Sequence, residues 1–167
     1  TGEIVFQLAG LLNVPMDQEI AGCLYVAIST DTGNFAYANT TPETMRIAAK
    51  LMETGIDIAQ INQSTYHSLP LKRVKLMGHV LNDMQVFADG KIGVACVTWP
   101  EMQRRCTSGE DADGIINYVR DVDTVEVAIF IRGVPNGSFK VSLRSKGKVD
   151  VARIAHAFDG GGHVLPI

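Results

Sequence analysis

Residues 83–98, DMQVFADGKIGVACVT, mark the point at which the chain changes from helical to strand periodicity. Apolar and polar residues alternate on both sides of Asp89-Gly90, as they do in a half-buried strand. Asp-Gly between two such runs is a strong hairpin signal, because both residues tolerate the left-handed backbone of a tight turn. The stretch therefore predicts a β-hairpin at the start of a domain that contains a sheet.

The residues after this hairpin predict an alternation of helix and strand. Residues 109–122, GEDADGIINYVRDV, indicate a helix whose acidic first turn suits the helix dipole. Residues 125–133, VEVAIFIRG, and 139–146, FKVSLRSK, indicate two further strands, and 150–158, DVARIAHAF, indicate a last short helix. We therefore expect residues 84–167 to form a small α/β domain with a mixed sheet.

The residues before the hairpin have helical patterns. Apolar residues recur at helical spacing in 1–12, and 17–30 are largely apolar. Thr41-Pro42-Glu43 opens a clear helix with proline at its first position, and a short helix follows. We expect residues 1–66 to be a mostly helical part, and 67–83, which begin with the basic stretch HSLPLKRVK, to be a linker and connecting helix.

The composition is that of an ordinary globular protein. Of its 167 residues, 46% are hydrophobic and 20% are charged, which is enough apolar material for a core. The net charge of −3 argues against strong nonspecific binding to nucleic acid, but it is compatible with a local basic patch.

The cysteines and the apolar runs indicate where the protein works. Three widely spaced cysteines without a CxxC pair suggest neither a zinc site nor a disulfide framework, and favour a reduced, cytoplasmic setting. No apolar run approaches the roughly 20 residues that span a bilayer. The first residues, TGEIVFQLAG, carry neither an initiator Met nor a basic region, so we expect a piece of a longer protein.

Asp31 is the first candidate functional residue. It follows an apolar segment within STDTGNF, residues 29–35, and precedes Thr32-Gly33. A carboxylate at the end of a buried element is a common metal ligand or catalytic acid. Asp-Thr-Gly is equally an ordinary turn in which the side chain bonds to nearby backbone.

A second candidate lies in KVSLRSK, residues 140–146. If this stretch is a strand, Ser142, Arg144 and Lys146 share one face. A hydroxyl, a guanidinium and an ammonium suit a phosphate group, because Arg forms bidentate bonds to its oxygens. The alternative is a half-buried edge strand with a solvated polar face.

The third candidate is the glycine run near residue 160. Successive backbone N–H groups in such a turn can form an anion-binding nest, and the following histidine adds a donor. The alternative is the end of a helix that leads into a chain terminus. The residues concerned are Gly160, Gly161, Gly162 and His163.

Together and in this order, these stretches resemble the C-terminal portion of the DHH family of phosphoesterases. The resemblance covers nearly the whole chain and is carried by TDTGNF at 30–35, VSLRSK at 141–146, DVARIAHAF at 150–158 and GGGH at 160–163. Members include the RecJ exonuclease, nanoRNases that also act as phosphoadenosine phosphate phosphatases, cyclic-dinucleotide phosphodiesterases and exopolyphosphatase-like proteins. The more usual residue at position 159 is a fourth glycine, whereas this chain has Asp159.

The resemblance implies roles for the candidate residues. In that family a catalytic domain binds two divalent cations, usually manganese, and Asp31 matches one of the metal ligands. A smaller domain closes over the cleft and holds the phosphate and nucleotide of the substrate, and its histidine reaches toward the scissile phosphate as a catalytic group. The positions matched in this smaller domain are Ser142, Arg144, Gly160, Gly161, Gly162 and His163.

The Asp-His-His motif that names the family does not occur in the chain. We therefore expect residues 1–66 to be the end of a catalytic domain, and the chain to be an inactive fragment of a cytoplasmic, manganese-dependent phosphoesterase. Its expected partner is a phosphate-containing substrate, such as short RNA or DNA, a small nucleotide or polyphosphate. The resemblance also allows a homodimer, and no membrane partner is expected.

Two alternatives from other functional classes stay open at this point. A related domain occurs at the C-terminus of alanyl-tRNA synthetases, where it contributes to RNA binding, so the chain can be a non-catalytic nucleic-acid-binding module. A purely structural interaction domain would have no affinity for phosphate.

Overall fold

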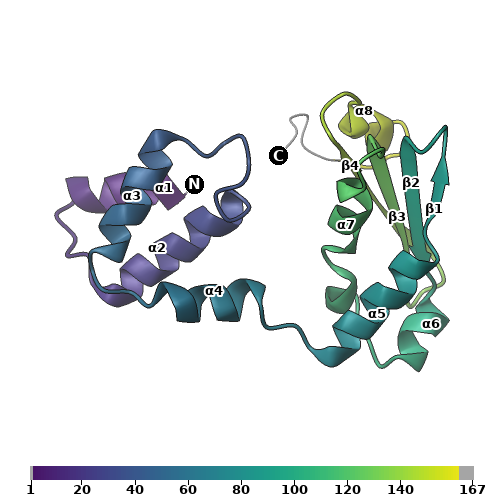
Figure 1. The fold of residues 1–167 in the computed structure, drawn as a ribbon, viewed down its shortest axis with the longest axis horizontal. Helices are drawn as coiled ribbons and strands as arrows, with labels where there is room; N and C mark the ends of the chain where they lie inside the picture. The colour runs from purple at the N-terminus through teal and green to yellow at the C-terminus, as the bar shows by residue number, and fades with distance from the viewer. Residues whose placement is uncertain (1, 162–167) are drawn as a thin grey trace. The chain divides into compact units, whose positions relative to one another are not determined.

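The structure is a computed structural model, and it describes residues 2–161. The described chain separates into two compact units, with the division between Ser68 and Leu69 (Figure 1). The first unit consists of four helices. They are α1 (Gly2–Leu11), α2 (Gln18–Asp31), α3 (Pro42–Met52) and α4 (Ile58–Tyr66).

Helix caps set the helix boundaries of the first unit. The Asp17 carboxylate accepts a hydrogen bond from the backbone N–H of Ile20 and caps α2. Thr41 and Thr44 form a reciprocal capping box at the start of α3, where Pro42 takes the first helical position. Each cap satisfies backbone donors that no helical carbonyl can reach. The three helices α1 to α3 then enclose a core of buried apolar side chains on α2 and α3.

The second unit combines helices with a sheet. It contains α5 (Leu71–Asn82), β1 (Gln85–Phe87), β2 (Ile92–Val97), α6 (Trp99–Arg104), the 3₁₀ turn η1 (Glu110–Ala112), α7 (Ile115–Asp121), β3 (Val127–Gly133), β4 (Phe139–Ser145) and α8 (Val151–His156).

The four strands form one mixed sheet in the order β1-β2-β3-β4. β1 and β2 are the antiparallel hairpin predicted around Asp89-Gly90, and both of these residues have a positive φ. β2 and β3 are parallel, with α6, η1 and α7 in the connection between them, and β3 pairs antiparallel with β4. The predicted α/β class with a mixed sheet is therefore confirmed.

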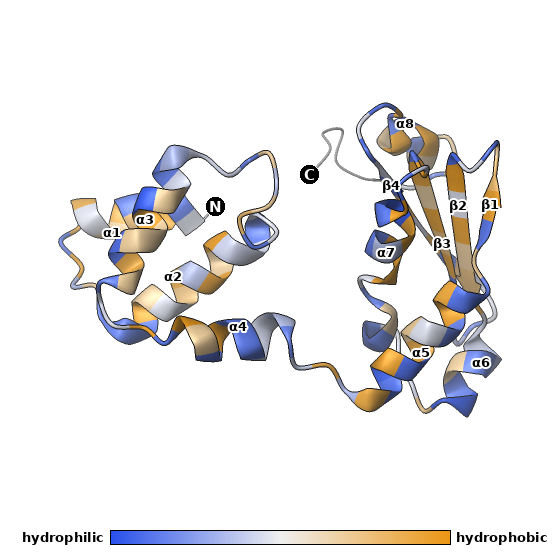
Figure 2. Ribbon diagram, in the orientation of Figure 1, coloured by the Kyte–Doolittle hydropathy of each residue, from blue (hydrophilic) through white to orange (hydrophobic). Residues whose placement is uncertain are grey.

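The core of the second unit lies on one face of this sheet. Ala95 and Phe130 are register partners on the parallel pair β2 and β3, and both are buried. Leu76 from α5 and Val119 from α7 pack into the same cluster. Figure 2 shows how apolar residues concentrate on β2 and β3. Because α5 contributes core residues, it is part of the second unit.

Two elements differ from the sequence-based expectation. The helix predicted over 109–122 is interrupted, because Asp113 is extended and Gly114 adopts a left-handed φ of 85° between η1 and α7. Helix α6 was missed, although Thr98 and Glu101 form a capping box, a pattern readable in the sequence as Thr-x-x-Glu. In the described part of the chain, no helix has the length and apolar character needed to cross a membrane.

Candidate phosphate-binding site

Strand β4 presents its polar side chains on one face. In the ladder with β3, Lys140 lies opposite Arg132, Ser142 opposite Phe130, and Arg144 opposite Ala128. Because register partners of a sheet point to the same side, these polar residues share the face on which the core is built.

Lys146 follows the last residue of β4, and its ammonium is engaged elsewhere. Strand β4 ends at Ser145, and the Lys146 ammonium donates to the carbonyl oxygens of Val122 and Asp123 at 2.6 and 3.2 Å. It therefore binds the carbonyls that follow α7, as a cation at a helix C-terminus commonly does. Lys146 therefore does not line the pocket that Ser142 and Arg144 share.

A cavity of about 240 Å³ lies where this face meets the loop between η1 and α7. Its lining combines apolar side chains of the core with polar groups of β3 and β4. The lining residues are Ala112, Asp113, Gly114, Ile116, Phe130, Arg132, Lys140, Ser142 and Arg144. The structure thus brings Ser142 and Arg144 into one pocket.

The pocket is basic. Arg132, Lys140 and Arg144 supply three positive charges to its lining, against the one carboxylate of Asp113. A guanidinium N–H of Arg144 donates to the Leu143 carbonyl at 3.0 Å, which uses one of the five N–H donors of an arginine. The net charge of −3 is compatible with a local basic patch, and this pocket is one. Its residues suit an anionic ligand.

Arg132 is held more tightly than Arg144. Its side chain is only 14% exposed, donates to the Gly109 carbonyl and lies 3.5 Å from the Asp113 carboxylate. Its guanidinium therefore fixes one wall of the pocket as well as contributing charge. Sequence reasoning missed both Arg132 and Lys140. Each of the two residues follows the alternation of its own strand, so the sequence contains a signal for each. Bringing them into one pocket requires the register of β3 with β4.

Two cations of helix α5 hold the segment around Asp113 that lines the pocket. The Arg73 guanidinium donates to the Asp113 carbonyl at 2.7 Å, and the Lys72 ammonium lies 2.8 Å from the buried Asp111 carboxylate. Hydrogen bonds from Lys72 and Ser108 hold the pKa of Asp111 below its ordinary value. Asp111 and Asp113 form one of two Asp-x-Asp patterns in the sequence, the other being Asp121-Val122-Asp123. The carboxylates of Asp111 and Asp113 both face cations, so this pattern has a structural use here.

Asp31 ends α2 in the first unit, and its side chain is exposed. The next turn is strongly shaped: Gly33, Asn34 and Phe35 all have a positive φ. A Cβ on Gly33 would lie 2.3–2.5 Å from the Tyr37 ring, so glycine is required there both for its backbone conformation and for this contact. The turn therefore holds Asp31 at the exposed end of a buried helix.

A metal ion needs several ligands around one point. Within residues 2–161, no group of three or more His, Cys, Asp or Glu side chains could hold a metal ion. The side chains that the structure describes therefore do not fit a complete metal centre around Asp31.

The glycine run begins as the end of α8. Asp159 has a φ of 58°, its N–H donates to the His156 carbonyl at 3.2 Å, and the Gly160 N–H donates to the Ala155 carbonyl at 2.9 Å. This pair of bonds is the Schellman motif, in which the left-handed residue is most often glycine. The glycine that is more usual at position 159 would adopt this backbone at lower cost.

Gly160 and Gly161 are not among the described residues that line the pocket. A Cβ on Gly160 would lie 2.9 Å from the Ala155 carbonyl oxygen, whereas Gly161 is exposed and has no such neighbour. Two further predicted site residues, Gly162 and His163, lie outside the residues that the structure describes.

Comparisons with known proteins find relatives along nearly the whole chain. The DHHA1 domain model matches residues 89–165. The chain is 36% identical over 98% of its length to a bifunctional oligoribonuclease and PAP phosphatase, NrnA, of Thermus thermophilus, and covers 48% of that relative. A probable protein of the same name from Streptococcus mutans is 29% identical, and the chain covers 52% of it.

A solved structure has the same fold. It is an exopolyphosphatase-related protein from Bacteroides fragilis, with a TM-score of 0.91 and 32% identity over 98% of this chain and 49% of that one. The chain thus spans about half the length of the relatives it matches. The DHHA1 match, the oligoribonuclease relatives and this shared fold support the resemblance to the C-terminal part of a DHH-family phosphoesterase, and residues 89–165 match its DHHA1 domain.

Proposed function

We propose that this chain is part of a phosphoesterase that hydrolyses phosphodiester or phosphomonoester bonds in short oligonucleotides or small nucleotides. We further propose that the pocket around Ser142 and Arg144 holds a phosphate group of the substrate. The observation that carries the proposal is the convergence of three cations and a hydroxyl on one pocket of the second unit.

The pocket residues would have different tasks. Arg144 can offer two parallel N–H donors to two phosphate oxygens, and Ser142 can add a hydroxyl donor. Lys140 contributes charge without a fixed geometry. Arg132, which is already bonded to the Gly109 carbonyl, keeps the wall of the pocket in place. His163 is proposed to contact the phosphate as charge develops on it, with Gly160, Gly161 and Gly162 allowing close approach of the backbone.

We propose Asp31 as one ligand of a divalent metal ion, with manganese as the ion that the family resemblance implies. Such an ion would polarise a phosphoryl oxygen and supply a nucleophilic hydroxide. The other ligands would have to come from outside the described residues. The three cysteines are free, which supports our proposal of a cytoplasmic location.

The non-catalytic RNA-binding module is the weaker alternative. The alignment with the Thermus thermophilus oligoribonuclease runs through 98% of the chain, so it includes the helical unit with Asp31 as well as the DHHA1 domain. That extent favours the phosphoesterase.

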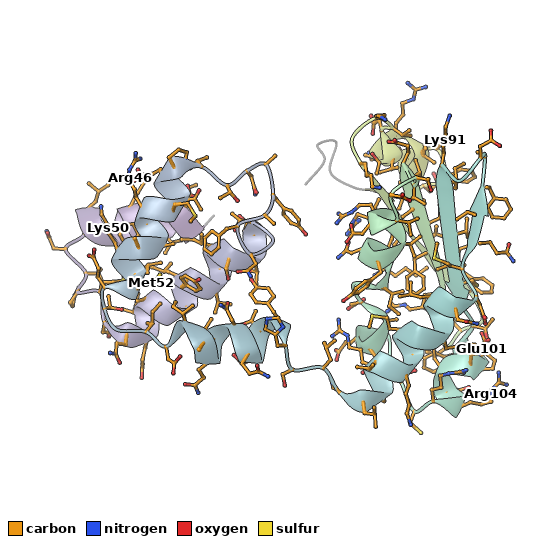
Figure 3. All side chains as sticks on the ribbon, in the orientation of Figure 1. Arg46, Lys50, Met52, Lys91, Glu101 and Arg104 are labelled. Carbon is orange, nitrogen blue, oxygen red and sulfur yellow. The ribbon has the colours of Figure 1, made fainter. Side chains whose placement is uncertain are left out.

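Substituting Arg144 tests the proposal. Charge-assisted hydrogen bonds contribute about 1.5–3 kcal/mol each, so in the complete enzyme Arg144→Lys should raise KM for a short oligoribonucleotide about tenfold or more. Arg104→Lys is the matched control, because Arg104 is exposed on α6 and does not line the pocket (Figure 3). Equal KM values for both variants would remove Arg144 from substrate binding.

A further inference from the structure

Helix α1 exposes a continuous apolar stripe. Ile4, Val5, Leu8, Leu11 and Leu12 recur at helical spacing, and between 48% and 80% of each residue is exposed. We call these five residues the α1 stripe. Scattered exposed apolar side chains are normal in proteins, but a contiguous apolar patch commonly marks an interaction surface.

The opposite side of α1 already packs against its own unit. Gly2 is buried, and a Cβ there would lie 2.7 Å from Ile28 on α2. Phe6 packs against the core of the same unit. Helix α1 therefore carries apolar side chains on two sides, and a helix that is apolar all round is normally buried.

We propose that the α1 stripe packs against polypeptide of the same protein that lies beyond these 167 residues. The length of the relatives supports this occupant, because the chain covers 48% of the Thermus thermophilus relative and 49% of the Bacteroides fragilis chain. About as many residues again are present in each of them. The α1 stripe would then lie inside the hydrophobic core of a larger domain.

A second copy of the chain fits the α1 stripe less well. A stable interface between separate proteins needs about 20–30 residues on each side, whereas the stripe offers four side chains on a helix of 10 residues and a fifth directly after it. A segment of the same polypeptide needs no such area, because covalent connection gives it a high effective concentration.

A lipid surface also fits less well. Helices that lie on membranes combine an apolar face with Lys and Arg on the polar face, which attract anionic lipids. Helix α1 contains neither Lys nor Arg, and its one charged residue is acidic. That residue, Glu3, accepts a hydrogen bond from the Thr44 hydroxyl within the unit.

Hydroxyl-radical footprinting tests the proposal without a substitution, because it oxidises exposed leucine and isoleucine side chains. The 167-residue chain is compared with the product of the complete reading frame that contains it. Oxidation of Leu8 and Leu11 should be at least about fivefold lower in the complete protein at every protein concentration. In a second measurement, Leu8→Glu with Leu11→Glu should lower the thermal midpoint of the complete protein and leave that of the 167-residue chain unchanged. Gln7→Glu, an exposed polar position on α1, is the matched control and should change neither.

Four results would overturn the proposal. A complete reading frame that adds no residues would remove the occupant, and equal oxidation in both proteins would show that the stripe stays exposed. Protection that disappears on dilution would assign the stripe to a second copy. Protection that appears only with phosphatidylserine vesicles would assign it to a membrane.

Discussion

Glu101 offers a quantitative test of how the second unit is held together. One of its carboxylate oxygens accepts from the Thr98 N–H at 2.8 Å and the Thr98 hydroxyl at 2.5 Å, and the other lies 3.3 Å from His79 Nε2. The side chain therefore closes the cap of α6 and joins α6 to α5. Figure 3 labels Glu101 on α6.

The contacts predict the size of its contribution. Hydrogen bonds from the side chain and the backbone of Thr98, with a smaller effect of His79, lower the pKa of Glu101 from 4.5 to about 2. A pKa that is lower by this amount in the folded state corresponds to a free energy of unfolding that is about 3 kcal/mol higher at pH 7. Because 27% of the side chain faces solvent, screening reduces this, and we expect Glu101→Gln to lower the free energy of unfolding by about 1–2 kcal/mol. For a unit of this size, that is a fall in the thermal midpoint of about 5–10 °C.

The effect should depend on pH. The pKa is lower in the folded state, so the ionised carboxylate stabilises the fold fully above about pH 4.5 and loses this contribution as the pH falls toward 2. The difference in midpoint between wild type and Glu101→Gln should therefore shrink to less than half by about pH 3. Thermal unfolding at pH 7, 5 and 3, with the exposed Glu110→Gln as control, measures this. An unchanged difference at pH 3 would refute the electrostatic reasoning, and an equal loss in the control would refute the role of this residue.

Three further predictions concern the candidate functional residues. Asp159→Gly should slow amide exchange in α8 about threefold, because glycine adopts the left-handed φ at lower cost. Asp159→Ala should speed the exchange. The reverse order of the two variants would contradict the assignment of Asp159 to the end of α8. Asp31→Ala should weaken manganese binding to the complete enzyme at least about tenfold, measured by calorimetry, and leave its thermal midpoint within about 1 °C; unchanged affinity would remove Asp31 from the metal site. His163→Ala should lower kcat more than it raises KM, and wild-type steady-state parameters would mean that the histidine takes no part in the reaction.

Local sequence signals predicted the elements of the fold well. Asp89-Gly90 specifies the hairpin and Asp17 the start of α2, because a turn or a cap depends on a few adjacent residues. The interruption at Gly114 and the helix after Thr98 also have local sequence signals, which are a glycine and a capping box. The strong apolar pattern of the neighbouring residues outweighed both signals in the prediction.

The candidate site was predictable only in part. Ser142 and Arg144 share a strand face, and alternation along one strand is enough to place them together. Arg132 and the Asp113 loop reach the same pocket through the pairing of β3 with β4 and through bonds from α5. Pairing and long-range bonds join residues far apart in the chain, so no short pattern records them. Lys146 continues the same alternation, but its ammonium binds the carbonyls of Val122 and Asp123 and it does not line the pocket.

Titration of the isotope-labelled 167-residue chain with adenosine 3′,5′-bisphosphate, followed by NMR, tests the central claim most directly. If the pocket of the second unit holds a substrate phosphate, backbone signals of residues 113–116 and 142–144 should shift together at millimolar ligand or below. Arg144→Ala should weaken this response at least about tenfold, because a bidentate phosphate contact is lost. Shifts confined to other parts of the chain, or an unchanged response in the variant, would contradict the account.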